Sequence, residues 1–305
     1  MMKKRPVVFN SLSQLHKAMG QPAPAHPLIS IMNYGEAKFD PKDFEHGIIL
    51  NFYKVSFKIS FSGKLKYGQG FYDFEEGGMS FIAPGQLLRM QDEEANYDGM
   101  TLHIHPDFLR PYSLNTSIKQ YGFFSYAAAE ALYLSEKEKT TILSVYRFIQ
   151  EELNERIDKF SQDVIISQVA LLLNYANRFY DRQFITRKTV NHDVLSKLES
   201  MLENYFKDEK ALTSGLPTVN RVAEELQLTP RYLSDLLRSL IGQNAQQFIH
   251  EKVIEKAKEY LSKNDLTVAE VGYHLGFEHP QSFTKLFKNK TQLTPLQFRA
   301  TLSKN

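Results

Sequence analysis

The sequence predicts an α+β protein in which the strands come first and the helices follow. Residues 26–110 alternate apolar and polar positions between glycine and proline breaks, as the short strands of a barrel or a sandwich do. From Ser135 onward the apolar residues recur every three or four positions, which is the period of amphipathic helices. One helical pattern then occurs twice, at about 218–240 and 267–290. The chain therefore divides into β-rich residues 1–125, a helical segment 126–186 and an all-α domain 187–305.

Each predicted strand ends at a turn signal. The apolar run 48–55 continues into alternating Phe57, Ile59 and Phe61 and stops at Ser62-Gly63. Further strands are expected at 64–67, 71–74, 79–83 and 100–104. The aromatic residues on these strands either line a ligand pocket or fill the core, and the pattern leaves both open. They are Phe52, Tyr53, Phe57, Phe61, Tyr67, Phe71, Tyr72 and Phe74.

Composition excludes several classes of protein. With 305 residues the chain has room for about two domains. It has no cysteine, which excludes disulfides, thiolate metal sites and a cysteine nucleophile, and suits the reducing cytoplasm. The basic residues 3–5 are not followed by an apolar run of signal-peptide length, and no run is long enough to span a membrane. We therefore expect a cytoplasmic protein without a membrane partner. The net charge of +2 does not by itself indicate nucleic acid.

Two amphipathic helices are expected between residues 135 and 180. Ser135 and Glu138 have the spacing of a capping box at the start of the first helix. The second helix has an apolar stripe that includes Leu172 and Phe179. One of the two stripes is expected to form a dimer contact, with Leu172 and Phe179 as its test positions. The polar run 181–191 is interpreted as the linker to the all-α domain.

Both copies of the repeat have the parts of a helix-turn-helix unit. Thr218 and Thr267 can each cap a first helix, and Thr267 does so as part of a capping box. A small residue, Ala223 or Gly272, stands where two helices must approach closely. A second helix then begins with proline in each copy, at Pro230 and Pro280.

The second helix of each copy has one apolar and one polar face. The polar faces carry Arg231, Ser234, Asp235 and Arg238 in the first copy, and Gln281, Thr284, Lys285 and Lys288 in the second. Such a face is typical of a recognition helix that enters the major groove of double-stranded DNA. The alternative is a helical bundle in which the repeat packs against protein. The duplication, with matched caps and polar faces, favours DNA. A long helix expected at 244–262 could hold the two recognition helices about 34 Å apart, one turn of DNA.

A longer run in the second copy allows a comparison with a known family. Residues 276–288 read Gly-Phe-Glu-His-Pro-Gln-Ser-Phe-Thr-Lys-Leu-Phe-Lys, and Leu293-Thr294-Pro295 and Phe298-Arg299 follow. This run resembles the second helix-turn-helix of the AraC/XylS family of transcription regulators, and the resemblance covers about residues 195–302. Three positions depart from the usual pattern. They are Ser282 and Phe298, where tyrosine is usual, and Gln292, where glycine is usual.

The resemblance implies roles in DNA binding for individual side chains. Contacts to base edges are implied for Arg231, Ser234, Asp235, Gln281, Thr284 and Lys285. Arginine can pair with guanine, glutamine with adenine, and aspartate can accept from the cytosine amino group. Phosphate contacts suit Arg238, Lys288 and Lys290 better. For Asp235 an ion pair with Arg231 or Arg238 is at least as good an interpretation.

The family plan also implies an N-terminal cupin-like β-barrel that binds a small-molecule effector, and helices that form a homodimer. The alternative is a β-rich segment that binds a protein partner, and RNA polymerase is a further candidate partner. A cupin enzyme is disfavoured. His103 and His105 share one strand face, but Pro106 follows, and the glutamate and later histidine of a cupin metal site are missing. No nucleophile and base stand at an interpretable spacing, so neither an enzyme nor a cofactor is expected.

Overall fold

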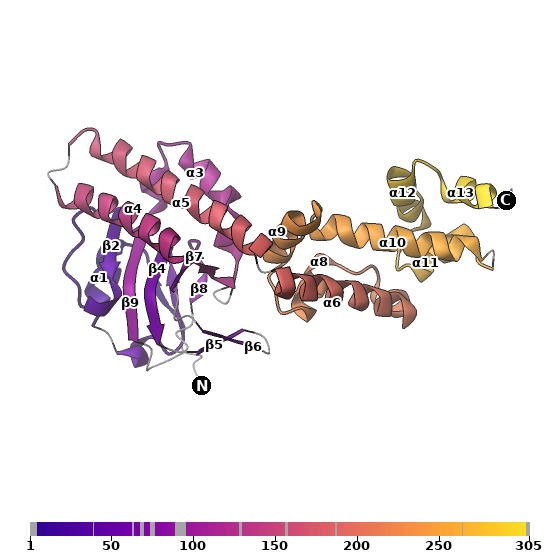
Figure 1. Cartoon of the computed structure of the whole chain (residues 1–305), viewed down its shortest axis with the longest axis horizontal. Coiled ribbons are helices and arrows are strands. Elements are labelled where there is room, and N and C mark those ends of the chain that lie inside the picture. Colours follow the sequence, from indigo (N-terminus) through magenta and orange to yellow (C-terminus); the bar gives the residue numbers. More distant parts are fainter. Residues whose placement is uncertain are drawn as a thin grey trace. The chain divides into compact units, whose positions relative to one another are not determined.

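The computed structural model divides the chain into two compact units, Met1–Gln183 and Phe184–Asn305. The secondary structure of the two units is labelled in Figure 1. The structure describes residues 5–38, 40–62, 64–67, 70–73, 77–88, 96–127, 130–155, 158–186, 188–263 and 265–302. No helix in this described part of the chain is both long and apolar enough to cross a membrane. The expected α+β class is confirmed, because sheets occupy the first unit and helices form the second.

The described strands of the first unit pair into three sheets. The largest is antiparallel, with the order β10 (Leu132–Tyr133), β7 (Gly78–Ile82), β4 (Tyr53–Ser62), β9 (Asn96–Ile104) and β2 (Ile29–Asn33). The second has the order β1 (Val7–Phe9), β3 (Ile48–Leu50) and β8 (Leu87–Leu88). The third is the hairpin β5 (Lys64–Tyr67) and β6 (Gly70–Asp73).

The predicted cupin-like barrel is not confirmed, because the described strands form separate sheets and no closed barrel. One reason lies at Asn51. The run 48–61 was expected as one strand, but it breaks here into β3 and β4, which belong to different sheets. The backbone N–H of Asn51 donates to the carbonyl of Phe9 at 3.0 Å, on the side of β1. Phe52, Tyr53 and Phe57 are buried, while the side chains of the other predicted aromatic residues lie outside the described set.

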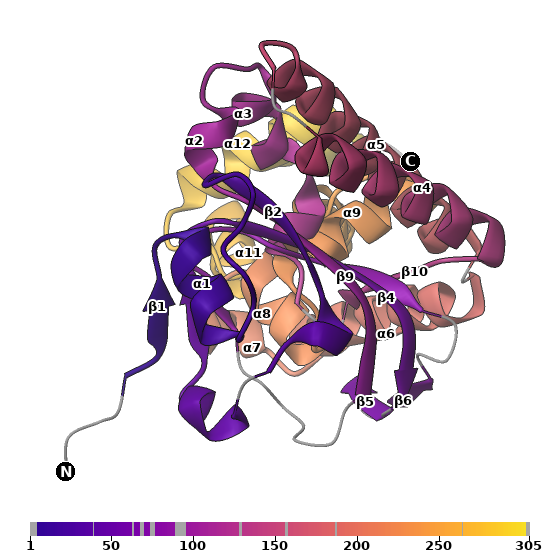
Figure 2. The ribbon, with the colours of Figure 1, turned by 90° about the vertical axis from the view of Figure 1, so that its left-hand side faces the viewer.

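The five-stranded sheet has one apolar face and one polar face. Along β4, Val55 and Phe57 alternate with Ser56 and Lys58, and successive side chains of a strand point to opposite faces. Two long helices, α4 (Glu136–Asn154) and α5 (Ser161–Thr186), cover the apolar face. The buried hydroxyl of Tyr146 on α4 donates to the carbonyl of Val55 at 2.8 Å. Figure 2 shows α4 and α5 on one side of the sheet and α1 (Leu12–Ala18) on the other.

Polar side chains fix the ends of α4 and α5. The predicted capping box of Ser135 and Glu138 is present at the start of α4. Arg182 on α5 pairs with Glu138 at 2.8 Å, and the amide of Gln183 donates to the carbonyl of Ala131 at 3.2 Å. The boundary between the two compact units falls within the run 181–191, which was interpreted as the linker, but the described residues of this run are helical. Helix α5 extends to Thr186 and α6 begins at Lys188, because the polar residues there anchor a helix instead of facing solvent.

Two short helices follow β9, α2 (Pro106–Leu109) and α3 (Leu114–Ser117). β9 ends at Ile104, as the proline at 106 predicts, and His105 leaves the strand to cap α2. Its Nδ1 accepts from the backbone N–H of Asp107 at 3.2 Å. His103 and His105 therefore do not act together, and no group of three His, Asp or Glu residues in the described regions is arranged to hold a metal ion.

The second unit is built entirely from helices around one core. They are α6 (Lys188–Lys207), α7 (Lys210–Ser214), α8 (Val219–Glu225), α9 (Pro230–Ile241), α10 (Ala245–Ser262), α11 (Val268–His274), α12 (Pro280–Thr291) and α13 (Pro295–Leu302). The long connecting helix expected at 244–262 is α10. Its buried residues Val253 and Ala257 belong to the same core as Leu233 of α9 and Phe283 of α12.

Gln292 ends α12 in a left-handed conformation, with φ of 64°. Gly242 ends α9 in the same way, with φ of 74°. A side chain in this conformation costs about 1–2 kcal/mol, whereas glycine adopts it freely. We expect Gln292→Gly to raise the free energy of unfolding of this unit by about 1 kcal/mol, measured by urea denaturation. Gln246→Gly, on an exposed turn of α10, should instead lower it by about 0.5–1 kcal/mol. Equal effects of the two substitutions would contradict this account.

Candidate nucleic-acid interface

The first helix-turn-helix unit consists of α8 and α9. The hydroxyl of Thr218 accepts from the backbone N–H of Arg221 at 3.3 Å, so the predicted cap of α8 is confirmed. Gln227 makes the turn in a left-handed conformation, with φ of 58°. Thr229 then caps α9 by accepting from the N–H of Tyr232 at 3.2 Å, and Pro230 is the first helical residue, as predicted.

The second helix-turn-helix unit, formed by α11 and α12, repeats this construction. Thr267 and Glu270 form the predicted capping box of α11, and the backbone hydrogen bond lowers the pKa of Glu270. Gly276 makes the turn, with φ of 90°. Its position corresponds to that of Gln227 in the first unit. Pro280 again opens the second helix, but here the side chain of the preceding residue, His279, makes no capping hydrogen bond.

The two helices of the second helix-turn-helix unit approach closely at Gly272. A Cβ atom at this position would lie 3.4 Å from the Cβ of Phe283, at the short end of ordinary contact. Phe283 is fully buried, and its ring lies 5.5 Å from that of Phe277 and 5.8 Å from that of Phe287. The expectation of a small residue at the helix crossing is therefore confirmed, and this aromatic cluster fixes α12 on the unit.

On α9 the predicted site residues lie on one face. Arg231, Ser234, Asp235 and Arg238 are spaced three or four positions apart, and the two arginine side chains are about half exposed. Asp235 lies between the arginines. Its carboxylate accepts from Nε of Arg231 at 2.9 Å and from Nη1 of Arg238 at 2.7 Å. The structure thus has the ion pairs that the sequence offered as the alternative for Asp235, and this carboxylate fixes both guanidinium groups.

On α12 the polar face is open to solvent and carries positive charge. Gln281, Lys285 and Lys288 are exposed, and so is Lys290 beyond them. Thr284 is partly buried, and its hydroxyl donates to the carbonyl of Pro280 at 3.1 Å. The proton of Thr284 is therefore used within the helix, which leaves its oxygen lone pairs and its methyl group for a partner. No acidic side chain in the described regions forms an ion pair with Lys285 or Lys288.

Helix α10 connects the two helix-turn-helix units. It has 18 residues, which corresponds to about 27 Å of helix. In Figure 1, α9 lies near the start of α10 and α12 near its other end. Asn244 and Gln247 form a capping box at the start of α10 that sequence analysis did not single out, although its spacing is recognisable.

Two arginines of this domain have structural contacts. Arg299 donates to the carbonyls of Leu261 and Leu266, at 3.3 and 2.7 Å, and so ties α13 to the end of α10. Arg221 donates to the hydroxyl of Tyr205 at 3.0 Å. No pattern in the sequence indicates these contacts, since the partners of an arginine depend on the tertiary fold.

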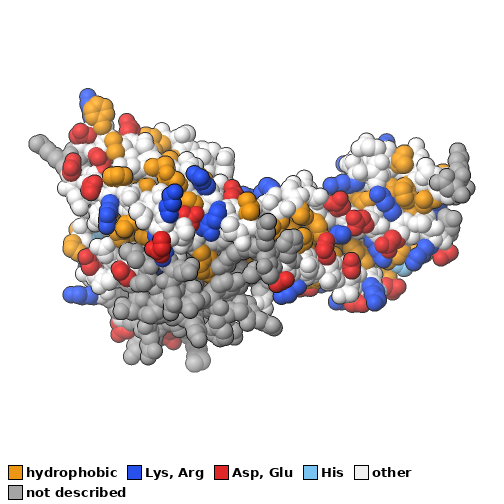
Figure 3. All heavy atoms as spheres, in the orientation of Figure 1, with side chains coloured by type: hydrophobic (Ala, Val, Ile, Leu, Met, Phe, Trp, Pro, Cys, Tyr) orange, Lys and Arg blue, Asp and Glu red, His pale blue; other side chains and the backbone are white. Residues whose placement is uncertain are grey.

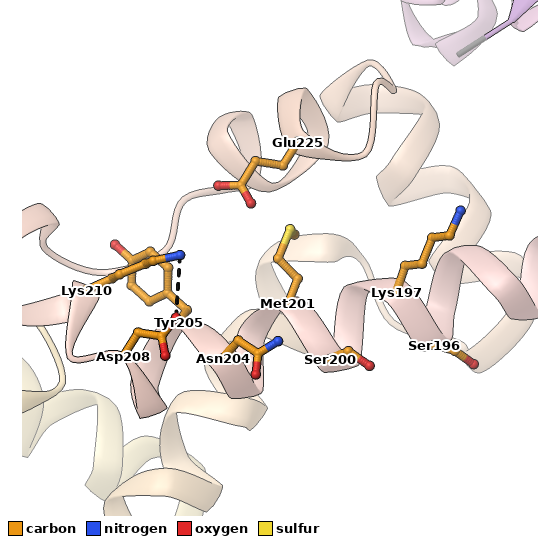
Figure 4. A pocket seen from close by; sticks show the side chains of 9 residues that line it. All are labelled: Ser196, Lys197, Ser200, Met201, Asn204, Tyr205, Asp208, Lys210 and Glu225. Atoms are coloured by element: carbon orange, nitrogen blue, oxygen red, sulfur yellow. Dashed lines mark ion pairs between the residues drawn. The ribbon is translucent and has the colours of Figure 1, made fainter. Parts of the chain in front are cut away.

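A shallow pocket of about 510 Å³ lies on α6, near α7 and α8. Its lining is mixed, with Met201 and Tyr205 beside polar and charged residues such as Asn204 and Glu225. Lys210 pairs with Asp208 at 3.7 Å across its edge (Figure 4). None of the predicted DNA-contact residues lines this pocket.

Comparison with known proteins agrees with this geometry. A family model described as a helix-turn-helix domain matches residues 222–301. The uncharacterized HTH-type transcriptional regulator YfiF of Bacillus subtilis is 21% identical over 253 residues, which cover 82% of this chain and 77% of that protein. Residues 222–301 are therefore a helix-turn-helix domain of the AraC type.

Other relatives match a smaller part of this chain. An uncharacterized HTH-type transcriptional regulator of Staphylococcus aureus strain MSSA476 is 23% identical over 180 residues, covering 56% of this chain and 23% of the relative. The chain thus spans about a quarter of the length of this relative. The C-terminal domain of the two-component response regulator yesN from Fusobacterium nucleatum is 29% identical, with a TM-score of 0.29, covering 33% of this chain and 96% of that one.

The three departures from the AraC-type pattern have separate structural settings. Gln292 keeps the left-handed backbone that glycine would favour. Phe298 packs its ring 5.5 Å from that of Phe287 and so belongs to the edge of the core. Ser282 is exposed at the first turn of α12, and its N–H donates to the carbonyl of His279 at 2.9 Å. All three positions lie outside the set of implied base contacts.

Proposed function

We propose that the chain is a DNA-binding transcription regulator whose recognition helices are α9 and α12. The observation that carries this proposal is the duplicated helix-turn-helix, in which each second helix buries one face and presents a polar face. Arg231, Gln281 and Lys285 are the most exposed candidates for base edges. Ser234 and Thr284 are only partly exposed and have shorter side chains, so they contact only base edges that come close to the helix. Asp235 acts mainly by holding its two arginines.

The phosphate contacts are assigned to Arg238, Lys288 and Lys290, whose charges are exposed on or beside the recognition helices. Such contacts release counterions, so affinity must fall as salt rises. The full-length chain should bind a random-sequence duplex with a log–log salt slope of several units, measured by fluorescence anisotropy between about 50 and 200 mM salt. Binding that is absent or insensitive to salt would remove the central proposal.

Lys288→Ala tests the phosphate assignment. It should weaken binding to all sequences alike and reduce the salt slope by about 0.9, the share of one phosphate. Lys207→Ala, at the exposed end of α6, removes the same charge away from the recognition helices and serves as the control. If Lys288→Ala and Lys207→Ala change the slope equally, only the net charge of the chain matters, and Lys288 has no phosphate contact.

For the N-terminal unit we propose a regulatory role, with a cupin-like region that senses a small-molecule effector. The sheet covered on one face by α4 and α5 supports this role, since its other face is polar and buried. A protein partner in place of a metabolite is the second candidate, favoured by exposed apolar side chains on α4 and α5, such as Phe148, Val164 and Leu171. In this proposal the chain works in the cytoplasm, with RNA polymerase as a further partner.

The same exposed side chains suggest how two copies of the chain would meet. Leu172 and Phe179 cannot serve as the test positions, because they are 0 and 7% exposed within the first unit. Phe148, Val164 and Leu171 are 54, 38 and 44% exposed, and hydrophobic side chains are visible over α4 and α5 in Figure 3. We propose that this surface forms a homodimer.

Leu171→Glu should therefore convert dimers into monomers in sedimentation velocity at micromolar concentration, because a charge would be buried without a partner. Lys137→Glu, exposed at the start of α4, is the control and should leave the dimer intact. A wild-type chain that is already monomeric at this concentration would contradict the proposed homodimer.

A further inference from the structure

The face of the five-stranded sheet opposite α4 and α5 is polar although it is buried. Ser30 of β2, Ser56 of β4 and Thr101 and His103 of β9 are between 1 and 4% exposed. In the strand register His103 lies opposite both Ser30 and Lys54, and Thr101 lies opposite Ser56. Directly opposite residues share a face, so these side chains form one continuous surface. A purely structural inner face would normally be apolar.

His103 lies at the centre of this surface. Its ring packs edge-on against Phe52, with the centroids 5.6 Å apart. Its Nε2 lies 3.5 Å from the hydroxyl of Thr101, while its Nδ1 is buried and has no hydrogen-bond partner among the described residues. A buried polar atom without a partner costs about 1–3 kcal/mol, and such atoms in folded proteins usually indicate a bound water, ion or ligand.

Two lysines lie on the same face of the sheet as His103. Lys54 and Lys58 extend from the same face of β4, and Nζ of Lys54 lies 5.5 Å from the ring centroid of Tyr34. The hydroxyl of Tyr34 donates to that of Ser56 at 2.8 Å. His16 on α1 also contacts this surface, and its Nε2 lies 3.0 Å from the hydroxyl of Ser30. This surface therefore combines two lysines with hydroxyl and imidazole donors.

The charge of Lys54 affects the pKa of each of the other titratable side chains on this face. Burial, with the charges of Lys54 and His16, lowers the pKa of His103 well below its ordinary value. Burial and the charge of Lys54 lower the pKa of Lys58 against the opposing effect of Tyr34. For Tyr34, burial raises the pKa, but the charges of Lys54 and Lys58 and its hydrogen bonds more than offset this, so that the phenol pKa is lowered. Burial is the largest cause of the shifts of His103 and Lys58, and the charge of Lys54 contributes to all three shifts.

We propose that this face of the sheet binds the carboxylate of a small organic acid, held by Lys54 and Lys58, with His103 and Tyr34 as further polar contacts. The inference rests on the proposed effector-sensing role and gives the effector its chemical class, an anion. Lysine ammonium groups donate charge-assisted hydrogen bonds to carboxylates, and these are stronger in a buried site than in water. The burial of the serine and threonine hydroxyls leaves the site selective for a ligand that can accept several hydrogen bonds.

The test uses the full-length chain without DNA. Acetate, butyrate, hexanoate and benzoate are compared with their primary amides, at constant ionic strength, by differential scanning calorimetry. At a concentration ten times its dissociation constant, a bound acid should raise the Tm of the N-terminal unit by about 3–6 °C. Its amide, which has nearly the same shape and no charge, should give less than about a third of this shift. Lys54→Gln should abolish the shift, and Lys54→Arg, which keeps the charge, should retain most of it.

Lys17→Gln, exposed on α1, is the matched control and should respond like the wild type. Far-UV circular dichroism checks that each variant is folded. The proposal is overturned if none of the acids raises the Tm, if the amides act equally, or if the shift persists in Lys54→Gln. DNA binding is measured separately on the same preparations. A chain that binds the acids but no DNA would contradict the regulator proposal alone, and a chain that binds DNA but no acid would contradict only the anion site.

Discussion

Replacing Phe283 by alanine should destabilise the second helix-turn-helix unit by about 3–5 kcal/mol, the usual effect of deleting a fully buried phenylalanine ring. The side chain is 0% exposed and lies between the rings of Phe277 and Phe287. Helix α11 packs closely against the same side chain, since a Cβ atom added to Gly272 would lie 3.4 Å from the Cβ and Cδ1 atoms of Phe283. Alanine would leave a cavity between the two helices. Most of the lost contact energy should therefore appear in the measured stability.

Hydrogen exchange of the full-length chain measures this effect locally. Peptides from α11 and α12 should lose protection by more than two orders of magnitude, while peptides from the sheet of the first unit should remain unchanged. Leu296→Ala is the control, since Leu296 is 67% exposed on α13 and should change stability by less than about 0.5 kcal/mol. A loss of less than about 1 kcal/mol in Phe283→Ala would show that the aromatic cluster does not fix α12.

The helix-turn-helix units were predictable because their determinants are local. Thr267 and Glu270 form their capping box within one turn, and Pro280 opens the next helix a few residues later. The spacing of Phe283 and Phe287 alone places both rings on one face. Each of these features depends on residues within about a dozen positions, so a pattern in the sequence is sufficient to find them.

The N-terminal unit was predicted less completely because its contacts are non-local. β1 pairs with β3 across some 40 residues, and no local pattern reveals that Asn51 separates β3 from β4. The helices in the polar run 181–191 were missed for a similar reason. The partners of Arg182 and Gln183, Glu138 and Ala131, lie more than 40 residues earlier in the sequence. A polar side chain anchored by distant groups is indistinguishable in sequence from one that faces solvent.

The ion pairs of Asp235 could be predicted from the sequence only in part. Spacings of three and four residues made pairs with Arg231 and Arg238 an explicit alternative, but the sequence could not show that one carboxylate takes both arginines. The same spacing would have allowed Asp235 to face a cytosine. Its side chain is only 16% exposed, which limits its reach toward a base. The structure therefore gives Asp235 an organising role in α9, where it holds both arginines.

Lys285→Ala should cost about 1–3 kcal/mol at the preferred site, a loss of about 5- to 150-fold in affinity, and should relax the preference at one base position. Lys285 is exposed on the polar face of α12, one turn from Gln281, and its ammonium group can donate to guanine. Asp235→Ala should have the opposite effect on random DNA, raising affinity by about 2- to 10-fold, because it removes a negative charge near the phosphates.

Asp235→Ala should nevertheless reduce sequence discrimination. The two guanidinium groups that Asp235 now holds at 2.9 and 2.7 Å become free to follow the nearest phosphate, so a fixed fork toward a base is lost. Selection from a randomised duplex library followed by sequencing measures both effects on the same full-length preparations. Asp235→Asn, which keeps the shape and can still accept from one arginine, should fall between wild type and alanine. If Asp235→Ala destroys binding while Lys285→Ala is silent, the first helix-turn-helix reads the bases more stringently than the second, and Asp235 contacts DNA directly.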